Sequence, residues 1–171
     1  MKSFFTTKRL CRAGVIAALY AALTYAFAPF AFGPLQFRPA EALCILPVFF
    51  PEAVPALYIG CMLSNLTSPY ILFDVFLGSL ATLLGALGTF AIGKAIKNTP
   101  LKIFLGGLSP VFFNTLIIPF IIVVLCGGVS AGETIVSAYF ATSLSIFLTE
   151  CLCVYGLGIP LYLFFEKRNK N

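Results

Sequence analysis

Six apolar segments alternate with short polar or Gly/Pro-containing stretches along the chain. Four of them are long enough to cross a bilayer, because a membrane-spanning helix needs about 20 apolar residues. The other two are short, and short helices at membrane depth are tolerated only where protein or a cavity covers them. We therefore expect them inside the bundle. The pattern predicts an all-α, six-helix transmembrane bundle with helices over about 11–31, 39–50, 52–65, 70–95, 101–126 and 133–165.

Composition supports the same class. Of the 171 residues, 60% are hydrophobic and 10% are charged, whereas an ordinary soluble domain has about 25% charged residues. Six helices and short loops account for the whole length. The sequence therefore predicts a single multi-pass domain in the lipid bilayer of the cell membrane.

The net charge of +5 is concentrated in three places. Lysines and arginines precede the first apolar segment, lie between the fourth and fifth, and end the chain. Such clustering follows the positive-inside rule and does not resemble a nucleic-acid footprint. It predicts that both termini are cytoplasmic. The clustered residues are Lys2, Lys8, Arg9 and Arg12, then Lys94, Lys97 and Lys102, then Lys167, Arg168 and Lys170.

Arg38 is the cation outside these clusters, and it lies three residues before Glu41. A charged side chain within a membrane segment usually faces a cavity or a partner. On the functional interpretation, Arg38 and Glu41 lie at the edge of a binding pocket. Local helix chemistry is the alternative, because Pro39 suits a first helical position and Glu41 is favoured there by the helix dipole.

Other polar side chains occur at different depths of the predicted bundle. Glu150 lies near the middle of a span with no cation nearby in sequence, so it needs a partner, a ligand or a proton. Asn114 also lies deep, although it could equally tie two helices together. Water could solvate the more superficial acids. The candidate substrate-binding residues are Glu150, Glu41, Asp74, Asn114, Asn65, Arg38 and Tyr139, of which Tyr139 shares a helical face with Ser143 and Glu150.

The first apolar segment carries two rows of alanines at a spacing of four. This spacing puts each row on one helical face, and small residues allow another helix to approach closely in lipid. The rows serve either packing within the chain or docking of a partner subunit. The candidate docking residues are Ala13, Ala17 and Ala21 on one row, and Ala18 and Ala22, continued by Ala26, on the other.

Catalysis finds little support. The chain has no His, and its six cysteines lack zinc-like spacing with a His partner, so no metal, cofactor or catalytic residue is expected. It has no Walker A motif and cannot be its own P-loop ATPase. A stand-alone channel, or an intramembrane enzyme that uses Asp74, Glu133 or Glu150 as acid or base, remains the alternative.

One motif resembles the QueT family of queuosine-precursor transporters, namely Gln36-Phe37-Arg38-Pro39-Ala40-Glu41-Ala42-Leu43. The segments 46–55, 59–66 and 74–83 and the regions of Asn114 and Glu150 are similar too, so the likeness spans about residues 13–162. It implies the substrate-binding S component of an energy-coupling factor (ECF) importer, with an outward-facing pocket under the loop after the first helix. A membrane scaffold subunit, docked on the Ala-rich first helix, and two ATPases would be its partners.

The implied cargo is a 7-deazaguanine such as preQ1, or queuine; an S component for another vitamin is the alternative. A guanine-like edge offers adjacent N–H donors, which Glu150 or Glu41 can accept as a bidentate pair. Asn114 would meet the carbonyl edge, and Asp74 would pair with the aminomethyl cation of preQ1. All of these roles are expectations from charge and depth.

Overall fold

A computed structural model describes residues 6–33, 36–129 and 132–170, and these residues form helices and no strand. The all-α prediction is confirmed. Seven helical stretches occur where six were expected, because the first segment breaks at Phe27 into α1 (Thr7–Ala26) and α2 (Ala28–Ala31). Pro29 explains the break: it lacks an N–H, and its ring clashes with the carbonyl four residues earlier in a continuous helix.

Three continuous helices are long and apolar enough to cross a membrane. Each contains a π-helical turn, an uncommon feature that often occurs at functional sites. The first comprises α4 (Ile71–Phe73), η2 (Asp74–Gly78) and α5 (Ser79–Ala95). The second comprises α6 (Thr99–Pro119) and η3 (Phe120–Leu125), and the third comprises α7 (Ile135–Cys151), η4 (Leu152–Leu157) and α8 (Gly158–Lys170).

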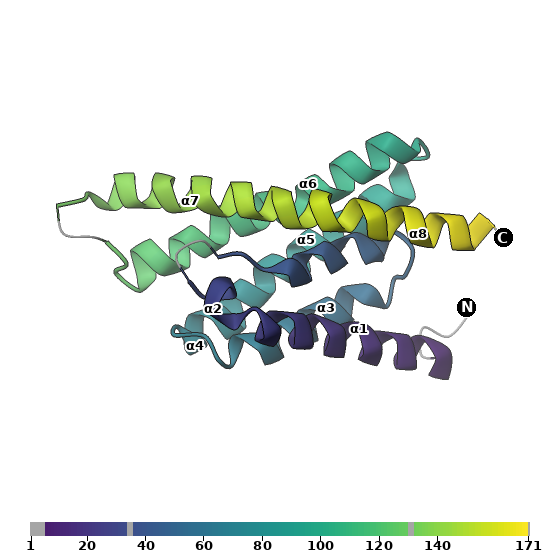
Figure 1. The fold of residues 1–171 in the computed structure, drawn as a ribbon, viewed down its shortest axis with the longest axis horizontal. Helices are drawn as coiled ribbons and strands as arrows, with labels where there is room; N and C mark the ends of the chain where they lie inside the picture. Colours follow the sequence, from purple (N-terminus) through teal and green to yellow (C-terminus); the bar gives the residue numbers. More distant parts are fainter. Residues whose placement is uncertain (1–5, 34–35, 130–131, 171) are drawn as a thin grey trace.

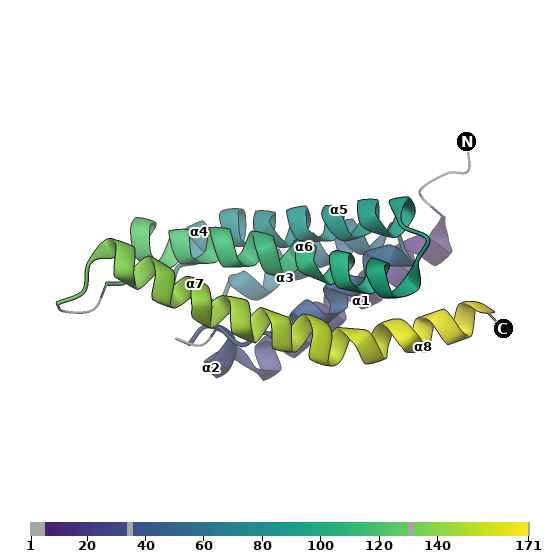
Figure 2. The ribbon, with the colours of Figure 1, turned by 90° about the horizontal axis from the view of Figure 1, so that it is seen from above.

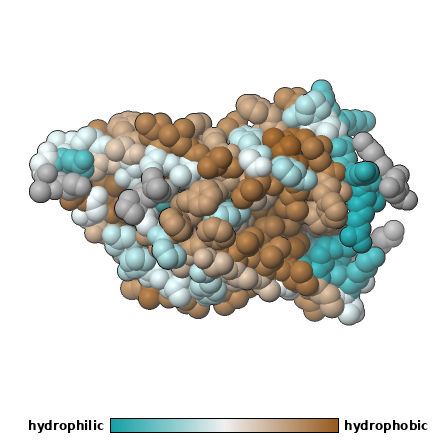
Figure 3. Space-filling model, in the orientation of Figure 1, coloured by the Kyte–Doolittle hydropathy of each residue, from teal (hydrophilic) through white to brown (hydrophobic). Residues whose placement is uncertain are grey.

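The helices run along the long axis of the molecule, and both termini lie at the same end (Figures 1 and 2). Figure 3 shows strongly hydrophilic residues at this terminal end and mainly hydrophobic residues along the middle. Many large apolar side chains are exposed there, as expected of a lipid-facing surface. The segment before η1 and the start of α7 lie toward the opposite end.

The centre of the bundle is a 3-10 helix, η1 (Pro39–Val48), which is followed by α3 (Ala53–Asn65). Every residue from Pro39 to Pro47 is buried, and η1 contacts α1, α3, α5, α6, η4 and α8. The prediction that the short segment lies inside is confirmed for η1. Ten residues in 3-10 conformation are unusual, since such runs rarely exceed three or four residues.

Small residues set the closest helix approaches. At Gly85 of α5, an added Cβ would lie 2.7 Å from the Cα of Pro110 on α6. At Gly60 of α3, it would lie 2.9 Å from both the Ala17 carbonyl and the Tyr20 Cβ of α1. Backbones approach this closely in membranes where side chains are small.

The two alanine rows of α1 therefore have different surroundings. Ala17 and Ala21 are buried against the rest of the chain, and Ala13 is partly buried. This row therefore serves packing within the chain. Ala18 and Ala22 are exposed. Only the second row is free to meet a partner in this structure.

Candidate functional site

A small polar hollow lies where three segments meet: the stretch before η1, α6 and α7. Its free volume is about 10 Å³, which is about what one water molecule needs. It is lined by Gln36, Arg38, Asn114, Ile118, Ile146 and Glu150. Three of the predicted site residues, Arg38, Asn114 and Glu150, therefore meet in one place.

Asn114 and Glu150 form the acceptor side of the hollow. They are 3% and 5% exposed, and Asn114 Nδ2 donates to Glu150 Oε1 over 2.9 Å. The remaining oxygens, Asn114 Oδ1 and Glu150 Oε2, are buried and have no hydrogen-bond partner. Leaving such atoms unsatisfied costs about 1–3 kcal/mol each, so this site is suited to a molecule that brings N–H or O–H donors.

Arg38 supplies donors at the same hollow. Its Nε donates to the Ala31 carbonyl and its Nη2 to Gln36 Oε1, each over 3.2 Å. The guanidinium also lies 5.2 Å from the centre of the Phe32 ring. Among the described residues, no carboxylate lies within ion-pair distance of it.

Three carboxylates nevertheless act on Arg38 at longer range. Glu41 and Asp74 interact with it electrostatically, as does Glu150 across the hollow. All three are buried. The neighbourhood therefore has more acidic groups than cations, an arrangement that favours a positively charged ligand.

Glu41 has partners inside the protein. Its Oε1 accepts a hydrogen bond from the Tyr20 hydroxyl over 2.5 Å, and its Oε2 accepts one from Cys44 Sγ over 3.0 Å. It does not line the hollow. Since Glu41 also occupies the first turn of η1, the local helix chemistry expected for it is present.

Asn65 and Asp74 belong to a second buried polar cluster. Asp74 Oδ2 accepts a hydrogen bond from Ser68, and Asn65 Nδ2 donates to the Asp74 carbonyl over 2.7 Å. The Nδ2 atom also reaches Ser79 Oγ at 3.4 Å, while Asn65 Oδ1 has no partner. These residues connect α3 to η2 and do not line the hollow.

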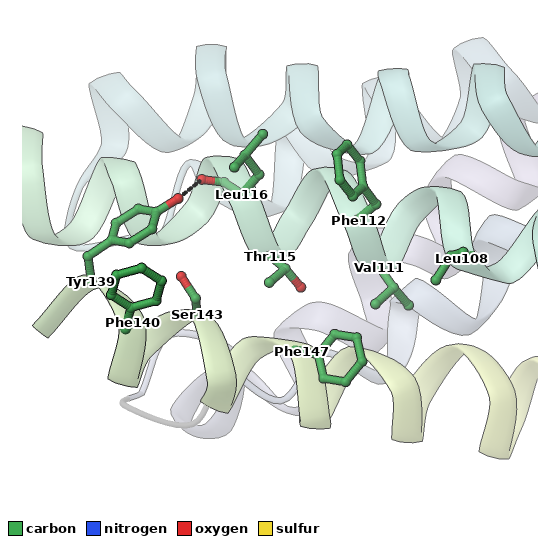
Figure 4. A pocket seen from close by; sticks show the side chains of 9 residues that line it. All are labelled: Leu108, Val111, Phe112, Thr115, Leu116, Tyr139, Phe140, Ser143 and Phe147. Carbon is green, nitrogen blue, oxygen red and sulfur yellow. Dashed lines mark hydrogen bonds between the residues drawn. The ribbon is translucent and has the colours of Figure 1, made fainter. Parts of the chain in front are cut away.

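Tyr139 lines a different cavity. This groove, of about 280 Å³, runs between α6 and α7 and is mainly apolar (Figure 4). The Tyr139 hydroxyl donates to the Leu116 carbonyl over 3.1 Å. Ser143 lines the same groove, whereas Glu150 does not. The common helical face therefore does not place Tyr139 in the polar hollow.

Sequence reasoning missed several partners. Glu52, which is not among the candidate site residues, is buried and forms an ion pair with Arg12 over 2.7 Å. Tyr20 and Cys44 were not assigned to the acids they contact. Gln36 was recognised only as part of a motif. None of these contacts has a local sequence signal, except that Cys44 lies three residues after Glu41, the spacing at which side chains eclipse in a 3-10 helix.

Within the described part of the chain, no group of three His, Cys, Asp or Glu side chains is placed to hold a metal ion. The hollow offers hydrogen-bonding groups: the unpartnered oxygens of Asn114 and Glu150, the Arg38 guanidinium and the Gln36 amide. This set recognises a small polar molecule by its donors and acceptors.

The spanning helices and the buried polar hollow define a multi-pass membrane protein of the cell membrane. Comparison with known families makes the assignment specific: the model for the QueT transporter family matches residues 10–167, nearly the whole chain. The chain therefore belongs to the QueT transporter family, a family of transporters and not of enzymes. No curated protein and no solved structure matched the chain.

Proposed function

We propose that this chain is the substrate-binding S component of an ECF-type importer, and that its cargo is a queuosine precursor, a 7-deazaguanine such as preQ1 or queuine. Membership of the QueT family supports this proposal. The observation that carries it is the pair of unpartnered acceptors, Asn114 Oδ1 and Glu150 Oε2, beside the Arg38 guanidinium.

The edge of a guanine-like base complements these groups. It presents N–H donors next to a carbonyl acceptor. Glu150 Oε2 and Asn114 Oδ1 accept from the N–H groups, and Arg38 donates to the carbonyl, because a guanidinium has donors only. This revises the role expected for Asn114: its Nδ2 already donates to Glu150, so its carbonyl oxygen is the atom available to the base.

The described conformation is closed around this site. A free volume of about 10 Å³ is far below the roughly 300 Å³ or more of typical ligand pockets. Two of the three walls are long helices, and the third is the stretch that carries Gln36 and Arg38. Movement of this stretch would open the hollow from the end that lies away from the termini (Figure 1).

Charge around the hollow favours preQ1 among the possible cargoes. Three acids, Glu41, Asp74 and Glu150, interact electrostatically with Arg38, the one cation that lines the hollow. An aminomethyl cation restores part of the balance, and a neutral group at the same position does not. Asp74 does not line the hollow, so its proposed effect on that cation is a longer-range attraction, like the one it exerts on Arg38.

The proposed orientation has both termini in the cytoplasm. The basic residues of α1, of the α5–α6 connection and of α8 lie at the terminal end, which is the hydrophilic end in Figure 3, in agreement with the positive-inside rule. The scaffold subunit of an ECF module, which also contains two ATPases, would dock on the exposed row of α1. Ala18 and Ala22 are available for this contact.

Mass spectrometry of small molecules that copurify with the protein tests the proposal most directly. A bound 7-deazaguanine is the expected result. Another bound vitamin would support the assignment as an S component but contradict the proposed substrate. Intrinsic turnover without a bound ligand would favour a stand-alone enzyme. Titration calorimetry with preQ1 and queuine then ranks the two precursors.

A further inference from the structure

Two routes connect Arg38 to the arm formed by α1 and α2. The guanidinium Nε donates to the Ala31 carbonyl at the end of α2. The Arg38 carbonyl accepts from the Glu41 N–H over 3.0 Å, and the Glu41 carboxylate accepts from the Tyr20 hydroxyl of α1 over 2.5 Å. The side chain of Arg38 is thus attached to α2, and its backbone is attached to α1 through Glu41.

The hydrogen bond between Tyr20 and Glu41 belongs to a fully satisfied buried unit. Tyr20 is completely buried and Glu41 is 1% exposed. Cys44, which eclipses Glu41 in the 3-10 helix, donates to the second carboxylate oxygen. The Glu41 carboxylate thus has a protein donor on each oxygen. It fixes η1 against α1, since loss of either donor would leave a buried acceptor without that partner.

We infer that Tyr20 and Glu41 are positioning residues: by fixing η1 to α1 they hold Arg38 at the hollow, so that the position of α1 determines how tightly the hollow binds its ligand. This rests on the proposed function, because it takes the hollow of Arg38, Asn114 and Glu150 as the substrate site. Neither positioning residue touches the ligand.

The first test compares two tyrosines of α1. Tyr20→Phe removes the hydroxyl that reaches Glu41, whereas Tyr25→Phe removes a hydroxyl that donates to the Leu63 carbonyl of α3 over 2.6 Å. Titration calorimetry with preQ1 should show a roughly fivefold loss of affinity for Tyr20→Phe, because a loosened Arg38 side chain must then be ordered when the ligand binds. Tyr25→Phe should bind as the wild type does. Equal affinities of all three proteins would overturn the inference.

A double-mutant cycle separates positioning from general loosening of the fold. If Tyr20 acts through Arg38, the affinity lost in Tyr20→Phe should vanish when Arg38→Gln is already present, since the two changes then affect one interaction. Additive losses would show that Tyr20 acts elsewhere, and would overturn the inference.

A readout without ligand keeps the two proposals apart. Hydrogen–deuterium exchange should become faster in residues 38–46 of Tyr20→Phe and remain at the wild-type rate there in Tyr25→Phe. Exchange in this segment that is the same in Tyr20→Phe and wild type would overturn the positioning role. A wild-type protein that binds no 7-deazaguanine would remove the proposed cargo, and the exchange result would still decide the role of Tyr20.

Discussion

Two regions of the molecule each bury an acid near an arginine, but the contact within the pair differs between them. At the terminal end, Arg12 and Glu52 are in direct contact at 2.7 Å, and Arg12 also lies 4.2 Å from the centre of the Phe50 ring. In the hollow, Arg38 and Glu150 line one space without an ion pair, and a carboxylate oxygen of Glu150 has no partner.

The difference separates a structural ion pair from the proposed binding site. A buried charge whose partner is already present stabilises the packing around it, and breaking the pair is costly. A buried polar atom without a partner costs free energy in the folded chain, and such an atom in a native structure calls for an explanation. A ligand that supplies the missing donors explains the hollow, whereas the terminal end needs no such molecule.

The largest expected effect is on stability, at the terminal end. Arg12→Ala leaves Glu52, whose side chain is 4% exposed, as an unpaired buried carboxylate. The protein should lose about 3 kcal/mol, the lower end for broken buried pairs because Arg12 is partly exposed. Thermal unfolding in detergent measures the loss, and the affinity for preQ1 should stay unchanged. Lys8→Ala, a change at an exposed cation of the same helix, is the control; equal stability of both variants would contradict the comparison.

The opposite outcome is expected in the hollow. Glu150→Gln keeps an acceptor for Asn114 Nδ2 but replaces the unpartnered oxygen with a donor. Affinity for preQ1 should fall more than tenfold, or about 1.4 kcal/mol, with little change in unfolding temperature. Titration calorimetry provides the check. The matched control is Glu133→Gln, because Glu133 is an exposed acid two residues before the start of α7. Unchanged affinity in folded Glu150→Gln would remove Glu150 from the site.

Sequence reasoning found the helices because hydrophobic runs are local. The observed helical stretches lie within a few residues of the expected ones, but the 3-10 geometry of η1 was not foreseen, since it arises from packing against six neighbouring elements. Depth and charge placed Arg38, Asn114 and Glu150 among seven candidate site residues, and these three line one hollow.

The remaining candidates could not be sorted from sequence alone. Like Glu150, Glu41 and Asp74 are acids within or beside apolar segments, and only the folded chain shows that Tyr20 and Ser68 already donate to them. The ion pair of Glu52 could not be predicted from sequence either, because its partner Arg12 is 40 residues away in the chain. Long-range donors decide whether a buried acid is structural or free.

A smaller effect concerns ligand charge. If the acids around Arg38 favour a cation, the wild type should bind cationic preQ1 roughly tenfold more tightly than the analogue with a neutral nitrile. Asp74→Asn should narrow this ratio to about threefold, because it removes one of the carboxylates that act on the site. Competition binding with both compounds measures the ratio, and Glu133→Gln should leave it unchanged. Equal binding of the two compounds by the wild type would show that the acids around Arg38 do not favour a cationic ligand.

The smallest effect is expected at Gln36, which lines the hollow and accepts from Arg38. Its φ of 51° lies in the left-handed region, which glycine adopts without strain. Gln36→Gly should therefore keep the stability while losing about threefold in affinity, since one partly exposed hydrogen bond contributes about 0.5–1.5 kcal/mol. Gln36→Ala should lose as much affinity. It should also lose some stability, because the hydrogen bond to Arg38 is gone and alanine, unlike glycine, does not relieve the strain of the positive φ. If both variants bind preQ1 as the wild type does, the Gln36 amide does not contribute to binding. The hollow would then differ from the Arg12–Glu52 region only in the unpartnered atoms of Asn114 and Glu150.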